Sequence, residues 1–364
     1  MSVTAATPQP GANEVNVLIA DDSLVIRGTI ARILKTVPGV RVVATVQNGQ
    51  AAVDRVKAGG IDVVVLDIEM PVMDGLTALP LLLKAEPGLS VIMASTLTTR
   101  NADISLQAIN LGAADYVPKP TSATDIFTTE DFRRELSEKV LHLGSRKKKI
   151  IITAAAPAPA VQLATVKRGL TKPRVLAIGS STGGPAALIK LFKALPKTIN
   201  VPVVVTQHMP PAFTAILAQN LQRDSGWTAK EAAEGDFLEP GRILVAPGDY
   251  HMLFEKNGTH VRVRLDKGPK ENFCRPAVDP MLRSLVTAYG PAVASVILTG
   301  MGHDGMAGCK TVVAEGGTVV AQDEQSSVVW GMPGAVSRAG IASAILPLDK
   351  IAAEIESIVG GRAL

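Results

Sequence analysis

The stretch Val175–Gly184, which reads VLAIGSSTGG, decides the fold of the longer half of this chain. Its first residues are apolar and predict a buried strand, whereas the small residues that follow predict a tight turn. The next segment, Pro185–Ile189, is typical of the start of a helix. A strand, a glycine-rich turn and a helix in this order are the repeating unit of a doubly wound parallel α/β sheet.

The same stretch contains the spacing G-x-S-x-G at Gly179, Ser181 and Gly183. At a strand-to-helix turn this spacing lifts a serine hydroxyl into position for nucleophilic attack, which makes Ser181 a candidate nucleophile. Ser180 is out of this register, so we expect it beside the site. A glycine-rich turn also binds phosphate or simply reverses the chain, and the stretch alone leaves these alternatives open.

Composition limits the class of protein. A length of 364 residues suggests two or three domains, and 47% hydrophobic residues suffice for real cores. No apolar run approaches the roughly 18 residues that span a bilayer, so we expect no membrane insertion. Residues 1–13 lack the basic start and apolar core of a signal peptide and read as a disordered leader. Cys274 and Cys309 have no metal-ligand spacing, and we expect reduced thiols in a cytoplasmic protein.

The net charge of +4 comes from one segment. Residues 1–140 carry 12 basic and 16 acidic residues, and residues 173–364 carry 18 and 17. Residues 141–172 carry 7 basic residues and no acidic ones, together with an Ala/Pro-rich run at 154–160. This composition predicts a semi-rigid linker at 141–172. Neither flanking region shows a basic face, so we expect no nucleic-acid binding.

Residues 14–140 alternate strand and helix five times, which predicts a flavodoxin-like (βα)5 domain with its site at the carboxyl ends of the strands. The expected strands are Val15–Ala20, Val40–Thr45, Ile61–Leu66, Ser90–Ala94 and Asp115–Val117, and the expected helices are 23–36, 49–58, 75–85, 102–111 and 125–142.

Polar residues follow these expected strands. Asp21, Asp22 and Asp67 would meet at one edge of the sheet and repel one another unless a cation lies among them. Oxygen ligands favour magnesium, and a carboxylate so placed can form an aspartyl-phosphate. Lys119 would then pair with the phosphoryl group and Ser95 would hydrogen-bond it. The alternative is that the carboxylates are ordinary loop acids or helix caps.

This domain resembles the receiver domain of bacterial two-component response regulators. The resemblance rests on residues 18–23 (LIADDS), 65–75 (VLDIEMPVMDG) and 112–120 (GAADYVPKP). It implies that Asp67 accepts phosphate from a histidine kinase, which would be a chemotaxis kinase if the resemblance of the second domain described below holds. It also implies Mg²⁺ ligands and switch residues: Asp21, Asp22, Asp67 and the Glu69 backbone carbonyl for the metal, and Ser95, Tyr116 and Lys119 for the switch.

Residues 173–364 form the second expected domain. The expected strands Pro202–Thr206 and Val293–Leu298 lead to His208 and Asp304, so both should lie at the same sheet edge as Ser181. A nucleophile, a base and a carboxylate that orients the base are what acyl transfer needs.

Other residues compete for these roles. His303 is a rival base, and Asp304 could merely cap a helix that starts near Gly305. His142 ends the first domain, and His251 and His260 lie in an expected hairpin, Tyr250–Glu255 and Thr259–Arg264, where a histidine is more often a surface residue.

The chain order Ser, His, Asp differs from the Ser, Asp, His order of α/β-hydrolases. The domain resembles the catalytic domain of chemotaxis protein-glutamate methylesterases. The resemblance rests on residues 178–185 (IGSSTGGP), 206–214 (TQHMPPAFT), 245–248 (VAPG), 275–279 (RPAVD), 298–305 (LTGMGHDG) and 331–333 (GMP). His303 departs from the family, whose members often carry Asn there.

The resemblance implies hydrolysis of glutamate γ-methyl esters on methylated chemoreceptors, with release of methanol and no cofactor for the ester chemistry. Ser181 would attack, His208 would transfer the proton, Asp304 would hold the imidazole, and Thr182 and the Met301 loop would supply oxyanion donors. Some members also deamidate glutamine. We further hypothesise that the unphosphorylated receiver covers the catalytic edge until Asp67 is phosphorylated.

A DNA-binding output domain would fit the receiver, but residues 173–364 show no helix-turn-helix unit with a basic recognition helix. Two other interpretations stay open: a binding module with a vestigial serine, and an esterase for receptors outside chemotaxis.

Overall fold

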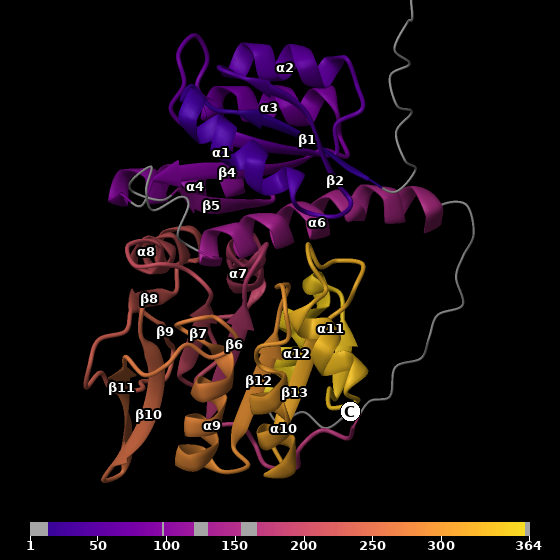
Figure 1. Ribbon diagram of the computed structural model, residues 1–364. Coiled ribbons are helices and arrows are strands. Elements are labelled where there is room, and N and C mark those ends of the chain that lie inside the picture. Colours follow the sequence, from indigo (N-terminus) through magenta and orange to yellow (C-terminus); the bar gives the residue numbers. More distant parts are fainter. Residues whose placement is uncertain (1–13, 97, 120–129, 154–165, 361–364) are drawn as a thin grey trace, which may run out of the picture. The chain divides into compact units, whose positions relative to one another are not determined.

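The computed structural model describes residues 14–96, 98–119, 130–153 and 166–360, so the expected leader at 1–13 lies outside the described residues. The chain divides into two compact units. One contains a five-stranded sheet, and the other contains a seven-stranded sheet and a two-stranded hairpin (Figure 1). Each unit is an α/β sheet covered by helices, which confirms the expected fold class.

The five-stranded sheet has the order β2-β1-β3-β4-β5, and all its strands are parallel. Its strands are β1 (Val15–Ala20), β2 (Val40–Val46), β3 (Val63–Asp67), β4 (Ser90–Thr96) and β5 (Asp115–Lys119). Because chain direction across the sheet reverses between β1 and β3, the residues that follow these two strands lie at a topological switch point, where ligands bind in such sheets.

The first four helices of this part of the chain agree with the sequence pattern within a few residues, whereas the fifth extends beyond it. They are α1 (Leu24–Lys35), α2 (Gly49–Lys57), α3 (Gly75–Ala85), α4 (Thr99–Asn110) and α6 (Glu130–Thr153). Ser23, Asn48 and Asp74 each cap the helix that follows by accepting a backbone N–H, which is why the first three helices begin where they do. Residues 120–129 lie outside the described part of the chain.

The segment expected as a linker, 141–172, is ordered at both ends. Helix α6 continues to Thr153 instead of ending near residue 142, because arginine and lysine favour helix and no proline occurs before Pro157. At the other end, the Val166 N–H donates to the Ala342 carbonyl at 3.0 Å, and Arg168 forms an ion pair with Glu354 at 2.5 Å. The expected domain boundaries stay a prediction.

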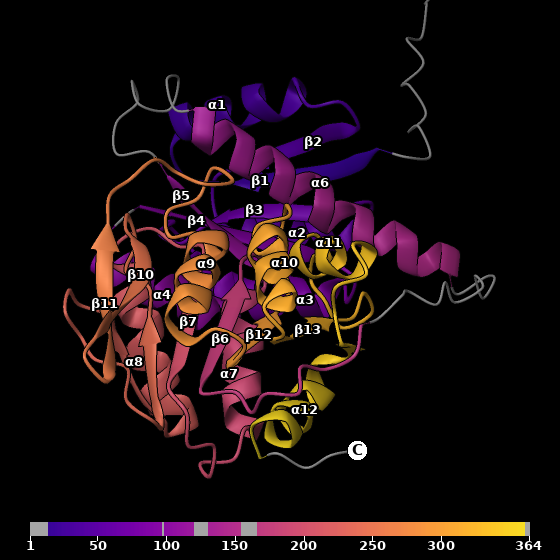
Figure 2. The same cartoon turned by 90° about the horizontal axis from the view of Figure 1, so that it is seen from below.

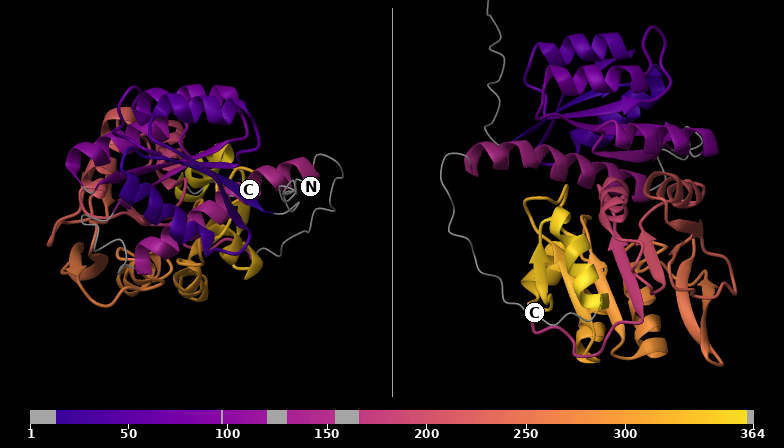
Figure 3. Two further views of the ribbon diagram at one scale, coloured as in Figure 1. Left: turned by 45° about the horizontal axis from the view of Figure 1, so that its top comes forward. Right: turned by 180° about the vertical axis from the view of Figure 1, so that it is seen from behind.

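The seven-stranded sheet has the order β14-β13-β12-β6-β7-β9-β8 and is also entirely parallel (Figure 3). Its strands are β6 (Val175–Ser180), β7 (Val203–Gln207), β8 (Thr228–Glu231), β9 (Arg242–Val245), β12 (Val293–Ile297), β13 (Thr318–Gln322) and β14 (Ala344–Leu346). The antiparallel hairpin β10 (His251–Asn257) and β11 (His260–Asp266) lies where the sequence predicts one.

Helices cover both faces of this sheet. Figure 2 shows one row formed by α9 (Val278–Tyr289), α10 (Met306–Ala314) and α11 (Met332–Arg338). The opposite row consists of α7 (Gly184–Ala194), α8 (Phe213–Ser225) and α12 (Leu348–Gly360). The central strands are therefore buried on both sides, in keeping with their continuous apolar runs. Among the described residues, no helix is long and apolar enough to cross a membrane.

Strand β6 pairs with β7 on one side and β12 on the other. Since the chain leaves β6 toward β7 and later returns to the opposite side at β12, the carboxyl ends of β6 and β12 form the switch point of this sheet. The residues that follow β6, β7 and β12 include Ser181, His208 and Asp304.

Candidate active site

Ser181 lies in a tight turn between β6 and α7. Its N–H donates to the Thr299 carbonyl at 3.0 Å, and its own carbonyl accepts the Gly184 N–H at 2.7 Å. Gly183 has a φ of 74°, a left-handed conformation that glycine adopts without strain. These bonds fix the backbone of Ser181, while its side chain stays partly exposed.

Gln207, the last residue of β7, holds this turn in place through hydrogen bonds of its side-chain amide. Its Oε1 accepts the Ser180 hydroxyl at 2.7 Å, and its Nε2 donates to the carbonyls of Ser181 at 3.0 Å and His208 at 3.3 Å. A Cβ at Gly184 would collide with Gln207 Oε1, so the turn requires glycine there. Ser180 is fully buried and has a structural partner, which leaves Ser181 as the accessible hydroxyl.

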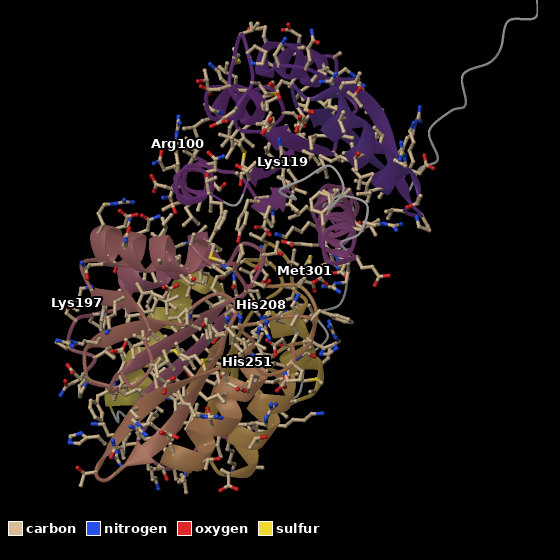
Figure 4. The ribbon with its side chains drawn as sticks, turned by 60° about the vertical axis from the view of Figure 1, so that its left-hand side comes forward. Arg100, Lys119, Lys197, His208, His251 and Met301 are labelled. Atoms are coloured by element: carbon tan, nitrogen blue, oxygen red, sulfur yellow. The ribbon has the colours of Figure 1, made fainter. Side chains whose placement is uncertain are left out.

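His208 and Asp304 form a hydrogen-bonded pair. His208 Nε2 lies 2.8 Å from Asp304 Oδ2. Because an ionised carboxylate only accepts, Nε2 carries the proton, and Nδ1 is the nitrogen whose lone pair can take a proton from a nucleophile. Cys274 Sγ lies 3.4 Å from this Nδ1. Figure 4 labels His208 together with Met301, near the carboxyl ends of the strands.

The carboxylate of Asp304 accepts five hydrogen bonds. They come from His208 Nε2, Asn272 Nδ2 and the backbone N–H groups of Val278, Asp279 and Gly305, at 2.6–3.1 Å. Burial alone would raise the pKa of Asp304, but its bonds with His208 and the two α9 N–H groups lower it to about 2.

Two of these donors begin helix α9, whose N-cap residue Ala277 has no side chain to cap it. Asp304 therefore caps α9 and bonds the N–H of Gly305, the N-cap residue of α10, as well as holding His208. The helix that Asp304 caps is therefore α9, whereas α10, the helix expected near Gly305, has no side-chain cap.

His208 has a raised affinity for its proton. Burial favours the neutral imidazole, but Cys274 and Asp304 outweigh burial and hold the pKa of His208 well above the usual 6.5. Among the described residues, the Ser181 hydroxyl makes no hydrogen bond to His208 or to any other group. Catalytic hydrogen bonds are often long in a free enzyme and tighten once substrate is bound.

Two backbone N–H groups are available next to Ser181. In the described part of the chain, the N–H groups of Thr182 and Met301 donate to no other residue, although the residues around them are firmly hydrogen-bonded. Gly300, for example, donates to the Val329 carbonyl at 3.0 Å, and its carbonyl accepts from Met332 at 2.8 Å. An anion formed at Ser181 could therefore accept from donors that are free and rigidly held.

The other histidines do not join this group. His303 is exposed, and His142 lies on α6 with its Nδ1 at 2.8 Å from the Glu138 carbonyl. His260 is exposed on β11, as expected for a surface hairpin. The same expectation was wrong for His251, which is only 3% exposed because its Nε2 lies 2.8 Å from the Pro269 carbonyl beneath the following loop.

Sequence reasoning missed Asn272, Cys274 and Asp279. Asn272 Nδ2 bridges Asp304 Oδ1 at 2.9 Å and Asp279 Oδ2 at 3.0 Å, and Asp279 in turn accepts the Gly308 N–H. The available signal was an Asn and a Cys directly before the family-like RPAVD segment, where the residue before the helix, Ala277, cannot cap it by its own side chain.

The first unit has its own cluster of charged residues at the ends of β1, β3 and β5. Lys119 Nζ lies 2.6 Å from both Asp21 Oδ2 and Asp67 Oδ1. Carboxylate oxygens of Asp21, Asp22 and Asp67 lie within 4.8 Å of one another, close enough to share one metal ion. The structure therefore brings together the three expected carboxylates and the expected lysine.

The ionised form of Asp67 is disfavoured in this cluster. Burial raises the pKa of Asp67 to about 6, the Asp21 charge adds to the rise, and Lys119 only partly offsets it. All the donors are oxygens, which suits a hard cation such as Mg²⁺. A cation there would stabilise the ionised form that a nucleophilic carboxylate needs.

The expected switch residues line the neighbouring strands. Ser95 and Tyr116 are both buried, on β4 and β5. Lys139 of α6, which sequence reasoning missed, donates to the Tyr116 carbonyl at 2.5 Å and pairs with Asp115 at 3.2 Å. Glu69 lies two residues beyond β3 with its side chain exposed, and its expected carbonyl role stays a prediction.

Comparison with known families agrees with both sites. Residues 176–355 match the CheB methylesterase family, and residues 17–129 match the response regulator receiver domain family. Among solved structures, the CheB methylesterase catalytic domain of Thermotoga maritima is similar, with 43% sequence identity and a TM-score of 0.50. The match covers 51% of this chain and 98% of that one.

Full-length relatives are similar as well. One from Paramagnetospirillum magneticum, named protein-glutamate methylesterase/protein-glutamine glutaminase 1, is 50% identical over 377 aligned positions. The alignment covers 98% of this chain and 99% of the relative. One from Azospirillum brasilense, named protein-glutamate methylesterase/protein-glutamine glutaminase, is 49% identical, with 95% and 93% covered.

Proposed function

Because this chain belongs to the protein-glutamate methylesterase/protein-glutamine glutaminase family and carries a receiver domain, we propose that it hydrolyses glutamate γ-methyl esters on chemoreceptors. The enzyme is a carboxylic ester hydrolase, and the family name extends the activity to glutamine side chains, whose amide carbonyl accepts the same attack. Receptor demethylation and deamidation would serve sensory adaptation in chemotaxis.

In the proposed reaction, the Ser181 hydroxyl attacks the ester carbonyl carbon and His208 Nδ1 takes the serine proton. The Asp304 carboxylate holds Nε2–H and stabilises the imidazolium. The N–H groups of Thr182 and Met301 stabilise the oxyanion, a contribution of about 3–4 kcal/mol for a single donor in comparable enzymes.

The imidazolium then gives its proton to the methoxy oxygen and methanol leaves. Water attacks the acyl-enzyme and His208 takes a proton from that water. The imidazolium returns this proton to the serine oxygen as the acyl bond breaks, so that glutamate is released and the Ser181 hydroxyl is restored. With a glutamine substrate the leaving group is ammonia. His208 moves the proton in each of these steps. The single observation that carries this proposal is therefore the hydrogen bond between His208 and Asp304, next to the turn that holds Ser181.

The test is methanol release from methylated receptors. Ser181→Ala should lower the turnover by about 10⁴-fold or more while leaving the fold intact. Ser180→Ala is the matched control, because the Ser180 hydroxyl bonds Gln207 and is buried. We expect it to lower stability by about 1 kcal/mol and to retain substantial activity. Near-normal methanol release by Ser181→Ala would contradict the assignment.

For the receiver we propose that Asp67 is the phosphate acceptor, with a chemotaxis histidine kinase as the donor. Asp21, Asp22 and Asp67 would hold Mg²⁺ together with the Glu69 carbonyl, and the oxygen-only donor set supports this. The ion would neutralise the excess negative charge and the charge of an incoming phosphoryl group. Lys119 would pair with that phosphoryl group, and Ser95 and Tyr116 would respond to it.

Phosphorylation would regulate the esterase. We expect a small-molecule phosphodonor with Mg²⁺ to increase methanol release by the full chain, and Asp67→Asn to abolish the increase without lowering the basal rate. An increase that persists in Asp67→Asn would exclude Asp67 as the acceptor.

A further inference from the structure

The loop between β11 and α9 carries two of the groups that contact the candidate catalytic pair, His208 and Asp304. Asn272 donates to Asp304 Oδ1 at 2.9 Å, and Cys274 Sγ lies 3.4 Å from His208 Nδ1. We call residues 267–274 the contact loop. Both contacts depend on the position of this loop, so a residue that holds the loop also influences the geometry of the pair.

The contact loop has no regular secondary structure, and its carbonyls at the β11 end are bonded to side chains instead. Arg275 Nη1 donates to the carbonyls of Lys267 at 2.9 Å and Gly268 at 2.7 Å. His251 Nε2 lies 2.8 Å from the next carbonyl, that of Pro269. The beginning of the loop is therefore held by two side chains, and one of them belongs to the residue that directly follows the loop.

The same guanidinium joins the loop to Asp249. Arg275 Nη2 and Nε donate to Asp249 Oδ1 at 2.6 and 3.1 Å, and the Asp249 N–H donates to the Arg275 carbonyl at 3.1 Å. The planar guanidinium can bond a carboxylate and two carbonyls at once, which the ammonium of lysine cannot do in the same geometry. Only 19% of the Arg275 side chain is exposed, so water competes little for these bonds.

Asp249 is itself held by the core of the larger sheet. In the segment before it, the Ala246 N–H donates to the Val205 carbonyl of β7 at 2.8 Å, and the Gly248 N–H donates to the Thr214 hydroxyl at 3.0 Å. Asp249 has a φ of 67°, in the left-handed region that aspartate enters more readily than most residues. Arg275 therefore connects the contact loop to a segment that is bonded to β7, the strand that precedes the candidate base.

Two of the family-like segments supply no side chain that reacts in the proposed mechanism. They are VAPG at 245–248, which directly precedes Asp249, and RPAVD at 275–279, which begins with Arg275. The bonds between Asp249 and Arg275 join the two segments at this point. A shared task for both segments is therefore to hold the contact loop.

We propose that Arg275, bonded to Asp249, is a positioning residue that keeps the contact loop in place against the candidate catalytic pair. The inference rests on the proposed esterase function. Arg275 does not touch the reacting atoms, and it acts through the two contacts that the loop makes, those of Asn272 and Cys274. Small displacements of groups that orient a base lower the rate of the chemical step more than they weaken substrate binding.

The experiment measures kcat and KM for methanol release from a methylated chemoreceptor by the full-length enzyme. Arg275→Gln should lower kcat about tenfold, as expected when a hydrogen bond to a charged group at the site is lost, with KM within about twofold. Arg275→Lys keeps the charge but not the fork, and it should lose about as much. A rise in KM alone, or full activity in Arg275→Lys, would overturn the inference.

The decisive comparison repeats Arg275→Gln in an enzyme whose loop no longer makes its two contacts, the double variant Asn272→Gly/Cys274→Ala. If Arg275 acts through these contacts, its replacement should change kcat less than twofold in this background. An arginine that only stabilises the fold would cost the same factor in both backgrounds. That result would overturn the inference, and so would an unchanged kcat when Arg275→Gln is the only change.

Asp249→Gly gives the same test without touching the arginine. Glycine keeps the positive φ without strain and deletes the carboxylate that holds the guanidinium, so we expect kcat to fall about threefold, again with less than twofold change in the double-variant background. Arg262→Gln is the matched control, because Arg262 also donates to a carboxylate, that of Glu255 at 2.6 and 2.8 Å, but joins β10 to β11. It should leave kcat and KM within about twofold.

A fall in kcat of equal size in Arg262→Gln would mean that any loss of an arginine–carboxylate pair in this part of the chain slows the enzyme, and would overturn the assignment to Arg275. Failure of the proposed function is a different result: the unmodified enzyme would then release no methanol from the receptor, or Ser181→Ala would release it normally.

Discussion

Asp67 and Asp304 occupy equivalent places in two parallel sheets, yet their electrostatics are opposite. Asp67 ends the buried strand β3 and Asp304 lies in the segment after the buried strand β12, each at a topological switch point. Burial raises the pKa of Asp67 to about 6. At Asp304, His208 and the N–H groups of Val278 and Asp279 outweigh burial and lower the pKa to about 2.

The difference follows from the tasks that we propose for the two groups. A carboxylate that attacks a phosphoryl group needs free lone pairs, and a saturated carboxylate would be a poor nucleophile. A carboxylate that orients an imidazole needs a fixed position and a stable charge, which saturation provides. The position in the fold therefore brings a carboxylate to the site, and the number of neighbouring donors decides what it can do.

The largest effect is expected for Asp304→Asn. The amide would present N–H to some of the present donors and would favour the wrong imidazole tautomer, so we expect kcat for methanol release to fall by about 10⁴-fold. The variant should also be less stable, because the start of α9 loses its charged cap. The stability that Asp304 provides is present above pH 3.8 and is lost as the pH falls through about 2.

Asp279→Asn is the matched control, since Asp279 is a buried carboxylate that shares the Asn272 amide with Asp304 but does not contact His208. Burial and the Asp304 charge raise the pKa of Asp279, so an amide should replace it at less cost. We expect a loss of less than about tenfold. Equal losses in the two variants would mean that the carboxylate pair acts as a unit.

Asp67→Asn should change stability in the opposite direction. A pKa raised from 3.8 to about 6 favours the folded state fully below pH 3.8, and that advantage is lost as the pH rises through 6. In metal-free buffer at pH 7, replacing Asp67 by an amide should therefore stabilise the receiver by up to about 3 kcal/mol. Urea unfolding at pH 4 and pH 7 measures the difference, which should nearly vanish at pH 4.

The control for this prediction is Asp22→Asn, because Asp22 is exposed in the same cluster. It should shift the free energy of unfolding by less than about 0.5 kcal/mol. If Asp67→Asn destabilised the receiver at pH 7, the two carboxylates would be alike, and the contrast between the sites would be wrong.

A smaller effect is expected from removing one donor of the saturated carboxylate. Asn272→Gly keeps the positive φ without strain and deletes the amide that bonds Asp304 and Asp279. Loss of a hydrogen bond to a charged group should lower kcat about tenfold and leave KM within about twofold. Asn272→Asp would add a third carboxylate and should lose more. An unchanged kcat in both variants would show that the remaining donors suffice.

The contrast between the two carboxylates also marks how far the sequence alone could lead. Asp67, His208 and Asp304 each follow an apolar run that predicts a buried strand, and parallel strands bring their carboxyl ends to one edge. The five-stranded sheet, the strands β6, β7 and β12 of the larger sheet, and the hairpin could be predicted from such patterns, whereas β8, β9, β13 and β14 were not. The roles of the site residues stay a proposal, although the structure brings the His208 and Asp304 side chains together.

The donors could not be predicted, because they depend on tertiary contacts that have no sequence period. Asn272 and Cys274 lie in the loop between β11 and α9, so their positions depend on how these two elements pack. Gln207 reads as the end of a strand, yet its amide holds Ser180, Ser181 and His208. Strand patterns thus locate candidate reactive groups, but the pKa values of these groups depend on neighbours that only the folded structure brings close.

Cys274 should have the smallest effect on rate and a clear effect on its pH dependence. The proposed base is the neutral His208, so kcat/KM should rise as the pH rises through the pKa of His208, which Cys274 and Asp304 hold well above 6.5 despite burial. The stability that protonated His208 provides has the opposite trend: it is fully present below pH 6.5 and is lost as the pH rises through the raised pKa.

Cys274→Ala removes the sulfur that faces Nδ1, so we expect the acidic limb of the kcat/KM profile to move to lower pH, with the plateau rate within about threefold. Cys274→Ser keeps a polar hydrogen at the position, but a hydroxyl, unlike a thiol, does not ionise in this pH range. If charge is the cause, its profile should move as far as that of Cys274→Ala; if the hydrogen bond is the cause, it should stay near that of the unmodified enzyme. If the profile moved in neither variant, Asp304 alone would be responsible for the raised pKa of His208. The contrast with Asp67 would then depend only on Asp304 and the groups that donate hydrogen bonds to it.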